Sequence, residues 1–295
     1  MTPLARILLA VLTLAPLVAA GSDPSKLDRA AAAVQPLVEQ AAGNGIRVSV
    51  GLADISGGDG GTRIVGSRES YNPASTIKLA LLAAAMRQAD RGLLNLDAPI
   101  SISPYMVVGG SGELQNQDMP HTTTVGEITR RMVVHSDNTA TNVLLYLVGL
   151  PTVQALLDDL GLGTMKFNRQ MFPGEKITQP ANVIDTADTL ALLQAIHGDE
   201  LLSEASRAQV LDWMRAQEVD TKFGAVLEQD YIAHKTGETG KVTHDVGYFL
   251  VPGSETVVAV FTEVEASDGY AETMRIGNPV VQQIAVAIHA ELERR

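Results

Sequence analysis

Hydrophobic and polar positions along the chain predict strands near both ends. Ile46–Val50 alternates apolar and polar side chains, as a half-buried strand does, and a second short strand is expected at 62–65 after a glycine-rich turn. Near the other end, apolar runs at 231–236, 244–251 and 256–264 are separated by turn residues. We expect these strands to join one antiparallel sheet.

Helices are predicted where apolar residues recur every three or four positions. The first is expected to open at Asp23-Pro24 and to end at Gly43, and the last to run from Pro279 to about Leu292. Between them we expect helices at about 73–91, 124–134, 139–148, 150–160, 181–196 and 203–214. The segments 93–121 and 161–180 are rich in polar and turn residues, which predicts loops.

This order predicts an α/β (α+β) fold, with an antiparallel sheet flanked by the N- and C-terminal helices and an all-helical lobe beside it. Within one domain at 21–295, an α/β lobe would comprise about 21–72 and 216–295. The helical lobe would comprise about 73–215. A cleft is expected between the two lobes.

Residues 1–20 have the pattern of an export signal. Arg6 supplies the positive start, an apolar run follows, and small residues precede Gly21. The apolar run is short and contains Pro16, which argues against a membrane span. We therefore expect a signal peptide at 1–20 and a secreted or periplasmic protein without a membrane span.

Composition excludes several kinds of protein. The net charge of −12 argues against nucleic acid and anionic membranes as partners. The absence of cysteine excludes disulfides, thiol catalysis and a lipid on cysteine. The six histidines form no H-x-x-x-H pair, so neither a metal nor another cofactor is expected. We expect a monomer.

The first candidate site is Ser75 and Lys78 in a predicted helix whose following residues are apolar. Residues three apart share a helical face, so the Lys78 amine would reach the Ser75 hydroxyl. Burial disfavours an ammonium ion, which would make Lys78 a base and Ser75 a nucleophile. A four-residue motif by itself is more often structural, so the interpretation depends on the rest of the chain.

Two further motifs follow in order. Ser136-Asp137-Asn138 lies in a polar turn between two apolar helices, and Lys235-Thr236-Gly237 lies in a predicted strand. This ordered triple resembles the signature of class A β-lactamases and penicillin-binding proteins. The resemblance extends to Asn142 and to Asp212-Trp213-Met214, and it spans nearly the whole mature chain.

The resemblance implies acyl-transfer chemistry on a β-lactam or a cell-wall peptide-like small substrate. Ser75 would form the acyl-enzyme, with Lys78 as its base. Ser136, helped by Lys235, would pass a proton to the leaving nitrogen.

It also implies substrate-binding roles. Asn138 would hold the substrate and steady Lys78, and Lys235 and Thr236 would clamp a substrate carboxylate. The backbone N–H groups of Ser75 and of Glu238, the residue after Gly237, would form the oxyanion hole. A glutamate side chain at this position would repel anionic substrates.

The sequence departs from the family pattern where the deacylating glutamate is expected. Arg169 fits, but Met171 stands in the glutamate's place, and a thioether cannot take a proton from water. Glu175 is either a displaced base or part of a surface ion pair. The arginine expected after the KTG strand is also missing, and His244 is either its substitute or structural.

Three functions remain open. One is a β-lactamase-like serine hydrolase, with activity on cyclic amides, that deacylates slowly. The second is a D,D-peptidase or esterase with the same chemistry. The third is a β-lactam- or muropeptide-binding protein without turnover.

Overall fold

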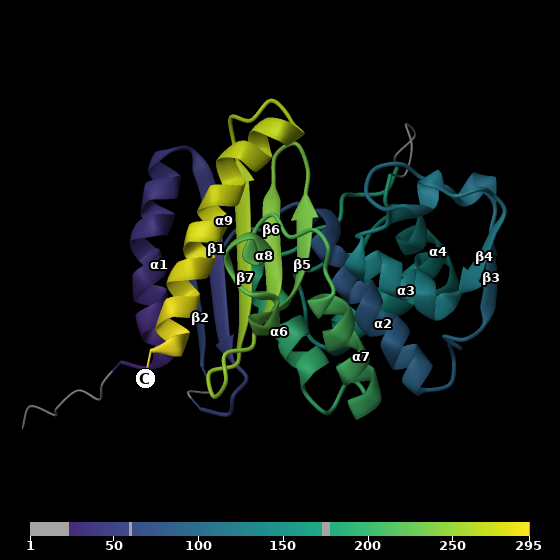
Figure 1. Cartoon of the computed structure of the whole chain (residues 1–295), viewed down its shortest axis with the longest axis horizontal. Helices are drawn as coiled ribbons and strands as arrows, with labels where there is room; N and C mark the ends of the chain where they lie inside the picture. Colours follow the sequence, from purple (N-terminus) through teal and green to yellow (C-terminus); the bar gives the residue numbers. More distant parts are fainter. Residues whose placement is uncertain (1–23, 59–60, 173–177, 295) are drawn as a thin grey trace, which may run out of the picture.

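The computed structural model describes residues 24–58, 61–172 and 178–294. In these residues one sheet has the strand order β2-β1-β7-β6-β5, with every neighbouring pair antiparallel (Figure 1). The strands are β1 (Ile46–Asp54), β2 (Thr62–Gly66), β5 (Ile232–Glu238), β6 (Thr243–Phe249) and β7 (Thr256–Val264). The predicted pairing of N- and C-terminal strands in one antiparallel sheet is confirmed.

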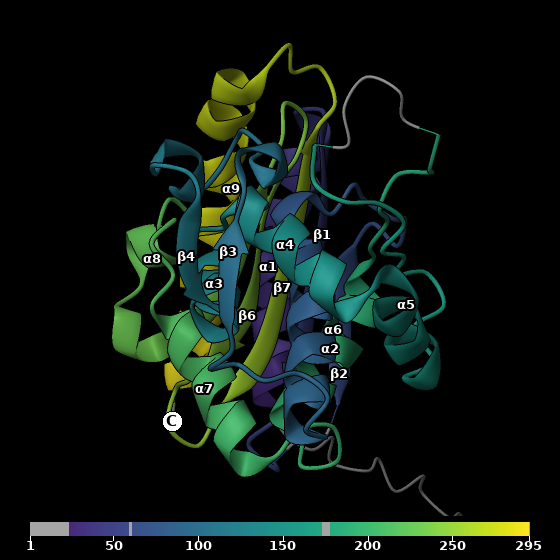
Figure 2. The same ribbon diagram turned by 90° about the vertical axis from the view of Figure 1, so that its right-hand side faces the viewer.

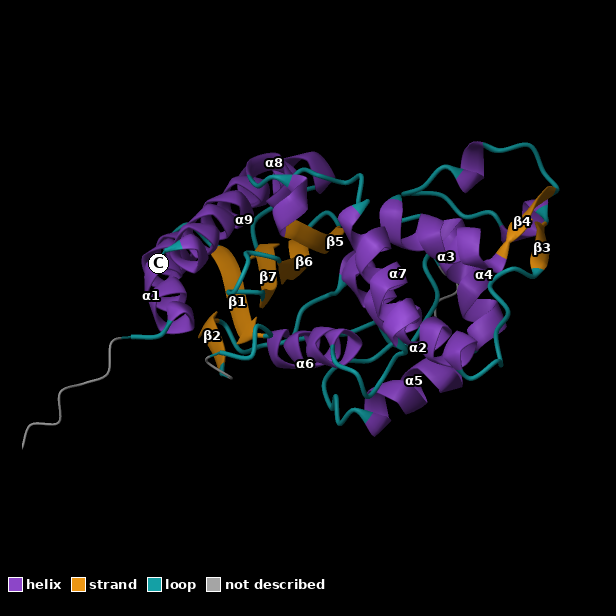
Figure 3. Ribbon diagram, turned by 60° about the horizontal axis from the view of Figure 1, so that its bottom comes forward, coloured by secondary structure: helices purple, strands orange, loops and turns teal. Residues whose placement is uncertain are grey.

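Helices cover both faces of the sheet. On one face lie α1 (Lys26–Gly43) and α9 (Tyr270–Glu293), which share an apolar core with the strands, and on the other lies α6 (Thr186–His197) (Figure 3). The flanking of the sheet by the terminal helices is thus as predicted. A second core joins the α6 face of the sheet to the helical lobe, so the lobes are packed through a continuous apolar interior.

The helical lobe surrounds the helix α2 (Lys78–Asp90), which is buried from Lys78 to Met86 and which the short 3-10 helix η1 (Ala74–Ile77) precedes. Its other helices are α3 (Val125–Val134), α4 (Asn138–Val148), α5 (Leu150–Asp159) and α7 (Glu204–Arg215). The short segments are η2 (Pro104–Met106), η3 (Leu114–Asn116), α8 (Phe223–Val226) and η4 (Gln229–Tyr231).

The lobe is not all-helical as expected. Strands β3 (Pro99–Ile102) and β4 (His121–Thr124) form a small antiparallel sheet within the segment predicted as loops (Figure 2). The sequence signal was weak because each strand has only four residues, and the prolines nearby indicate turns.

Capping residues explain where several helices begin. Thr124, the predicted start of a helix, accepts a hydrogen bond from the N–H of Glu127 at 3.1 Å. The first helix begins later than predicted, because the Ser25 hydroxyl accepts from the N–H of Asp28. Asp137 and Asp185 cap α4 and α6 in the same way.

The last helix, α9, begins at Tyr270, nine residues before its predicted start at Pro279. Pro279 therefore lies inside the helix and does not begin it. The side chains of Val281, Ile284 and Ile288 are buried against the sheet. The stabilisation from burying this apolar face exceeds the cost of the backbone hydrogen bond that Pro279 cannot donate.

No single helix in the described part of the chain has the length and apolarity of a membrane span. The α4–α5 pair meets that test only when joined, and it is bent by 79°.

Gly247 allows β6 to lie close to β5. A Cβ atom there would lie 2.1 Å from the Ala233 carbonyl oxygen and 2.6 Å from the His234 Cα, which are both backbone atoms. We therefore expect Gly247→Ala to lower the free energy of unfolding by about 1–3 kcal/mol, as overpacking does. Urea denaturation measures the effect.

Gly43→Ala is the matched control, because nothing lies within 4 Å of the Cβ that it adds. Its effect should stay within about 0.5 kcal/mol. Equal stability of the two variants would contradict the close approach of the strands.

Candidate active site

Ser75 lies in a tight turn of chain rather than in the regular helix that was expected to start at Pro73. Asn72 Oδ1 accepts from the N–H of Ala74 at 3.0 Å, and Ala74 has φ +47°. The 3-10 helix η1 then leads into α2. The Asn72 side chain therefore binds the N–H of Ala74 and not that of Ser75.

Lys78 is fully buried at the start of α2, and its amine is surrounded by acceptors from the 136–138 turn. Nζ donates to the Ser136 carbonyl oxygen at 2.6 Å, to Asn138 Oδ1 at 2.8 Å and to Ser136 Oγ at 3.3 Å. Burial lowers the pKa of Lys78 well below 10.5, and the positive charge of Lys235 lowers it further. In the described residues, no hydrogen bond joins Lys78 to Ser75, so the predicted direct contact is not made.

Ser136 lies between two lysines. Its Oγ is 3.0 Å from Lys235 Nζ as well as 3.3 Å from Lys78 Nζ. Two amine donors occupy the lone pairs of the Ser136 hydroxyl, which leaves the Ser136 proton to point elsewhere. The backbone of Ser136 has φ +54°, a conformation costly for a serine that persists where the surroundings enforce it.

Asp137 holds this turn in place, a role that the sequence analysis did not assign. One of its oxygens accepts from the N–H of Ala140 at 2.9 Å, and the other accepts from the N–H of Leu114 at 2.9 Å. Asn138 in turn donates from Nδ2 to the Gly109 carbonyl oxygen at 3.0 Å. The turn is therefore tied to the loop opposite, which fixes the acceptors around Lys78.

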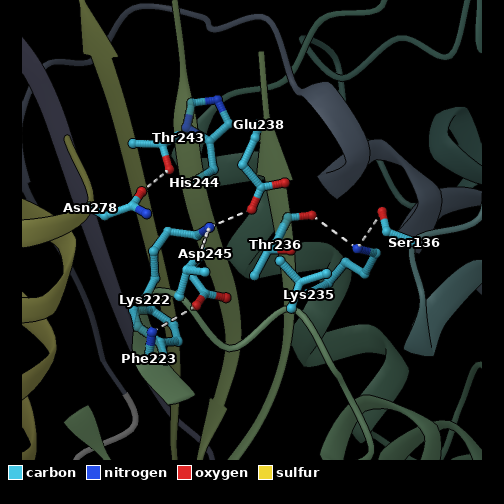
Figure 4. Close-up of polar contacts among 12 residues, drawn as sticks. Ser136, Lys222, Phe223, Lys235, Thr236, Glu238, Thr243, His244, Asp245 and Asn278 are labelled. Atoms are coloured by element: carbon cyan, nitrogen blue, oxygen red, sulfur yellow. Dashed lines mark hydrogen bonds and ion pairs between the residues drawn. The ribbon is translucent and has the colours of Figure 1, made fainter. Parts of the chain in front are cut away.

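Lys235 comes from β5, the edge strand next to η1. Its Nζ donates to Ser136 Oγ and to the Thr236 carbonyl oxygen, both at 3.0 Å. Burial lowers the pKa of Lys235 to about 8, while the charges of Glu238 and Asp245 act in the opposite direction. The Lys235 amine from the sheet and the Ser136 hydroxyl from the helical lobe are thus held together where the lobes meet (Figure 4).

The backbone of β5 directs the N–H of Glu238 away from the sheet. At the two ends of the β5–β6 pairing, the N–H of Thr239 donates to Val242 and the N–H of Leu250 donates to Tyr231. Antiparallel strands alternate, so the odd-numbered residues of β5 bond β6 and the even-numbered ones point outward. The outward edge faces η1, which carries Ser75.

Gly237 allows this contact between η1 and β5. A Cβ at Gly237 would lie 2.8 Å from the Pro73 carbonyl oxygen and 3.0 Å from the Thr76 nitrogen. Thr236 is buried beside it, and its hydroxyl has no hydrogen-bond partner within the described residues.

The Glu238 side chain forms an ion pair with Lys222, a second residue that the sequence analysis missed (Figure 4). The Lys222 side chain is fully buried, and the Glu238 side chain is 9% exposed. Lys222 also donates to Thr221 Oγ1 at 3.3 Å. A single lysine before a four-residue helix carries no sequence signal that distinguishes it from a surface residue.

His244 is structural and does not replace the missing arginine. Its Nε2 donates to the Asn72 carbonyl oxygen at 2.8 Å, and its Nδ1 accepts from the N–H of Thr262 at 3.1 Å. Burial lowers the pKa of His244 from 6.5 to about 4, so the ring is neutral at pH 7. It links the chain just before Ser75 to β7.

A cavity of about 680 Å³ opens at the junction of the lobes, with Ser75, Asn138 and Glu238 in its wall. Met171 also lines it, and both backbone polar groups of Met171 are bound by the Asn142 side chain, at 2.8 and 2.9 Å. Arg169 lies beside it in the wall. Glu175 lies outside the described residues, as does the predicted signal peptide at 1–20.

The described ranges contain no group of three or more His, Asp or Glu side chains arranged to hold a metal ion. The hydrogen-bond donors near the cavity are instead suited to a polarised carbonyl.

Proteins of similar sequence are β-lactamases. A sequence profile described as "Beta-lactamase enzyme family" matches residues 29–291. β-Lactamase AER-1 of Aeromonas hydrophila is 29% identical over 253 residues, covering 82% of this chain and 81% of the relative. The extended-spectrum β-lactamase PER-1 of Pseudomonas aeruginosa is 26% identical and covers 85% of both chains.

Solved structures show the same fold. A β-lactamase from Sphaerobacter thermophilus has a TM-score of 0.78 at 27% identity, covering 87% of this chain and 95% of that chain. The penicillin-binding protein PBP-A has a TM-score of 0.77 at 26% identity, covering 90% and 96%. A point mutant of PBP-A is described as an acyl-enzyme complex with penicillin G.

The class that the fold defines is that of β-lactamases and penicillin-binding proteins. This chain belongs to the β-lactamase enzyme family, within the class A β-lactamase superfamily. The predicted family is confirmed.

Replacement of His244 tests its neutral, buried role. His244→Phe leaves the Asn72 carbonyl and the Thr262 N–H without partners, which should cost about 1–3 kcal/mol at pH 7. The unfolded chain binds a proton below about pH 6.5, whereas folded His244 stays neutral to about pH 4. Between pH 6.5 and pH 4, protonation of His244 in the unfolded chain therefore lowers the stability of the wild type. The variant lacks this histidine and loses no stability through it.

The difference in unfolding free energy between wild type and His244→Phe should thus narrow as the pH falls from 6.5 to 4. Urea denaturation at a series of pH values measures it. His121→Phe, on the partly exposed strand β4, is the control for the residue change. A difference that stays constant with pH would rule out a neutral His244.

Proposed function

We propose that this protein is a β-lactamase-like serine hydrolase that forms an acyl-enzyme with β-lactams through Ser75. The observation that carries the proposal is the convergence of Lys78, Ser136 and Lys235 beside the cavity that Ser75 lines. An export signal at 1–20 would bring the protein to compartments where such compounds are met.

Ser75 attacks the carbonyl carbon, and Lys78 is the base that removes its proton. The lowered pKa of Lys78 supports this role, because a neutral amine is needed near neutral pH. The missing contact between Lys78 and Ser75 requires either a bridging water or a small movement when substrate binds.

Ser136 delivers a proton to the leaving nitrogen. Lys235 and Lys78 both donate to its oxygen, which favours release of the Ser136 proton toward the substrate. The N–H groups of Ser75 and Glu238 stabilise the oxyanion, in keeping with the outward direction of the Glu238 N–H. Asn138, which lines the cavity, binds the substrate together with Thr236 and Gly237 in this proposal.

Deacylation is slow in this proposal. Met171 takes the place of the family's glutamate, and the Asn142 clamp holds that position at the cavity wall. A methionine cannot activate the water that hydrolyses the acyl-enzyme. Acylation is therefore expected to outpace turnover.

The same observation favours a second candidate. A D,D-peptidase or esterase of this superfamily, or a binding protein without turnover, also needs acylation but not the glutamate. Release of D-Ala from a cell-wall peptide would identify a peptidase. Of the solved relatives, PBP-A is named as a penicillin-binding protein, which keeps this alternative open.

Intact-protein mass spectrometry tests acylation directly. Addition of benzylpenicillin should raise the protein mass by that of the intact antibiotic, because ring opening loses no atoms, and the adduct should persist for minutes. Ser75→Ala should form none. An unmodified wild-type protein with no hydrolysis would overturn the proposal, and rapid hydrolysis without an adduct would overturn slow deacylation.

Met171→Glu should restore a base at the cavity wall. We expect the adduct to disappear at least about 100 times faster than in the wild type, the lower end of what a positioned general base contributes. Met171→Gln, similar in size but without a basic carboxylate, is the control and should leave the lifetime long. Equal lifetimes in the two variants would contradict the role given to this position.

A further inference from the structure

Glu238 contributes more than a backbone N–H to the cavity wall. Its carboxylate pairs with the amine of the buried Lys222, a contact that Figure 4 marks with a dashed line. The neighbouring acid Asp245 is already engaged, because its oxygens bind His234 Nδ1 at 2.7 Å and the Phe223 N–H at 3.0 Å. Glu238 is therefore the carboxylate that offsets the charge of Lys222.

Two buried lysines thus lie near the site. The Lys235 amine donates to Ser136, and the Lys222 amine pairs with Glu238. Thr236, next to Lys235 in β5, has a buried hydroxyl with no hydrogen-bond partner in the described ranges. Without the Glu238 carboxylate, these groups would make a site for a substrate carboxylate.

Glu238 changes the charge of that site. Its negative charge offsets that of Lys222, and Glu238 lines the same cavity as Ser75. A substrate carboxylate brought beside it meets a like charge at short range, which is a means of rejecting a ligand. An uncharged substrate meets no such repulsion.

We propose that Glu238 is a specificity residue that acts as a built-in anion on Lys222 and selects against substrates with a carboxylate next to the scissile amide. The favoured substrates are acyl donors that are uncharged at this position. This inference rests on the proposed acylation of Ser75.

The test compares benzylpenicillin with its methyl ester, in which one methyl group removes the negative charge of the carboxyl group. The second-order rate constant for acylation of each is measured by intact-protein mass spectrometry. The readout is the ratio of the acid to the ester. Glu238→Gln removes the charge but keeps an oxygen that Lys222 can bind, so the fold is preserved.

We expect Glu238→Gln to raise the acid-to-ester ratio at least tenfold, because Lys222 becomes an uncompensated cation. Glu238→Asp, which keeps the charge, should leave the ratio near that of the wild type. The double variant Glu238→Gln/Lys222→Met should lose the gain, because the freed cation is absent.

The outcomes separate this inference from the proposed function. If both compounds acylate the protein and Glu238→Gln leaves their ratio unchanged, the specificity role is wrong and acylation stands. A gain that survives the loss of Lys222 would likewise overturn the role of the ion pair. If neither compound acylates the wild type or the variants, the proposed function is wrong, and this inference fails with it.

Discussion

The structure around the cavity depends on one constraint, the burial of lysine amines away from water. A buried amine without a hydrogen-bond partner is unfavourable whether or not it is charged, so each buried lysine must be surrounded by acceptors. Lys78 finds them in the 136–138 turn, Lys235 in Ser136 and Thr236, and Lys222 in Glu238. The contact between Lys235 and Ser136 ties the helical lobe to the edge of the sheet.

Several unusual backbone features serve this arrangement. Ser136 has positive φ, which aims both its carbonyl and its hydroxyl oxygen at Lys78. Gly237 lets η1 approach β5, so that Ser75 and the Glu238 N–H face the same space. His244 holds the preceding residue, Asn72, against the sheet. Strain at one residue is thus supported by packing and hydrogen bonds at many others.

Much of the fold follows from sequence periodicity, because strands and helices bury their apolar faces in regular patterns. The antiparallel sheet and the buried helix after Ser75 are examples. The errors arose where local signals compete with tertiary packing: Pro279 indicated a helix start, although a buried apolar face carries α9 through it. Strands β3 and β4 were too short for alternation to be visible.

In the site, too, local motifs were predictable and contacts between distant residues were not. Ordered motifs were sufficient to select Ser75, Lys78, Ser136 and Lys235 as candidates, and the structure brings the last three into hydrogen-bond contact. Partners distant in sequence could not be predicted. The Glu238–Lys222 pair and the hold of His244 on Asn72 depend on how strands and loops pack, which no local pattern records.

The central claim is that Lys78 is held where its amine is a base near neutral pH. NMR titration of protein labelled with ¹³C at lysine Cε measures this directly, with the Lys78 signal assigned by its loss in Lys78→Met. The account predicts a titration midpoint well below the 10.5 of an ordinary lysine. A midpoint at or above 10.5 would contradict it.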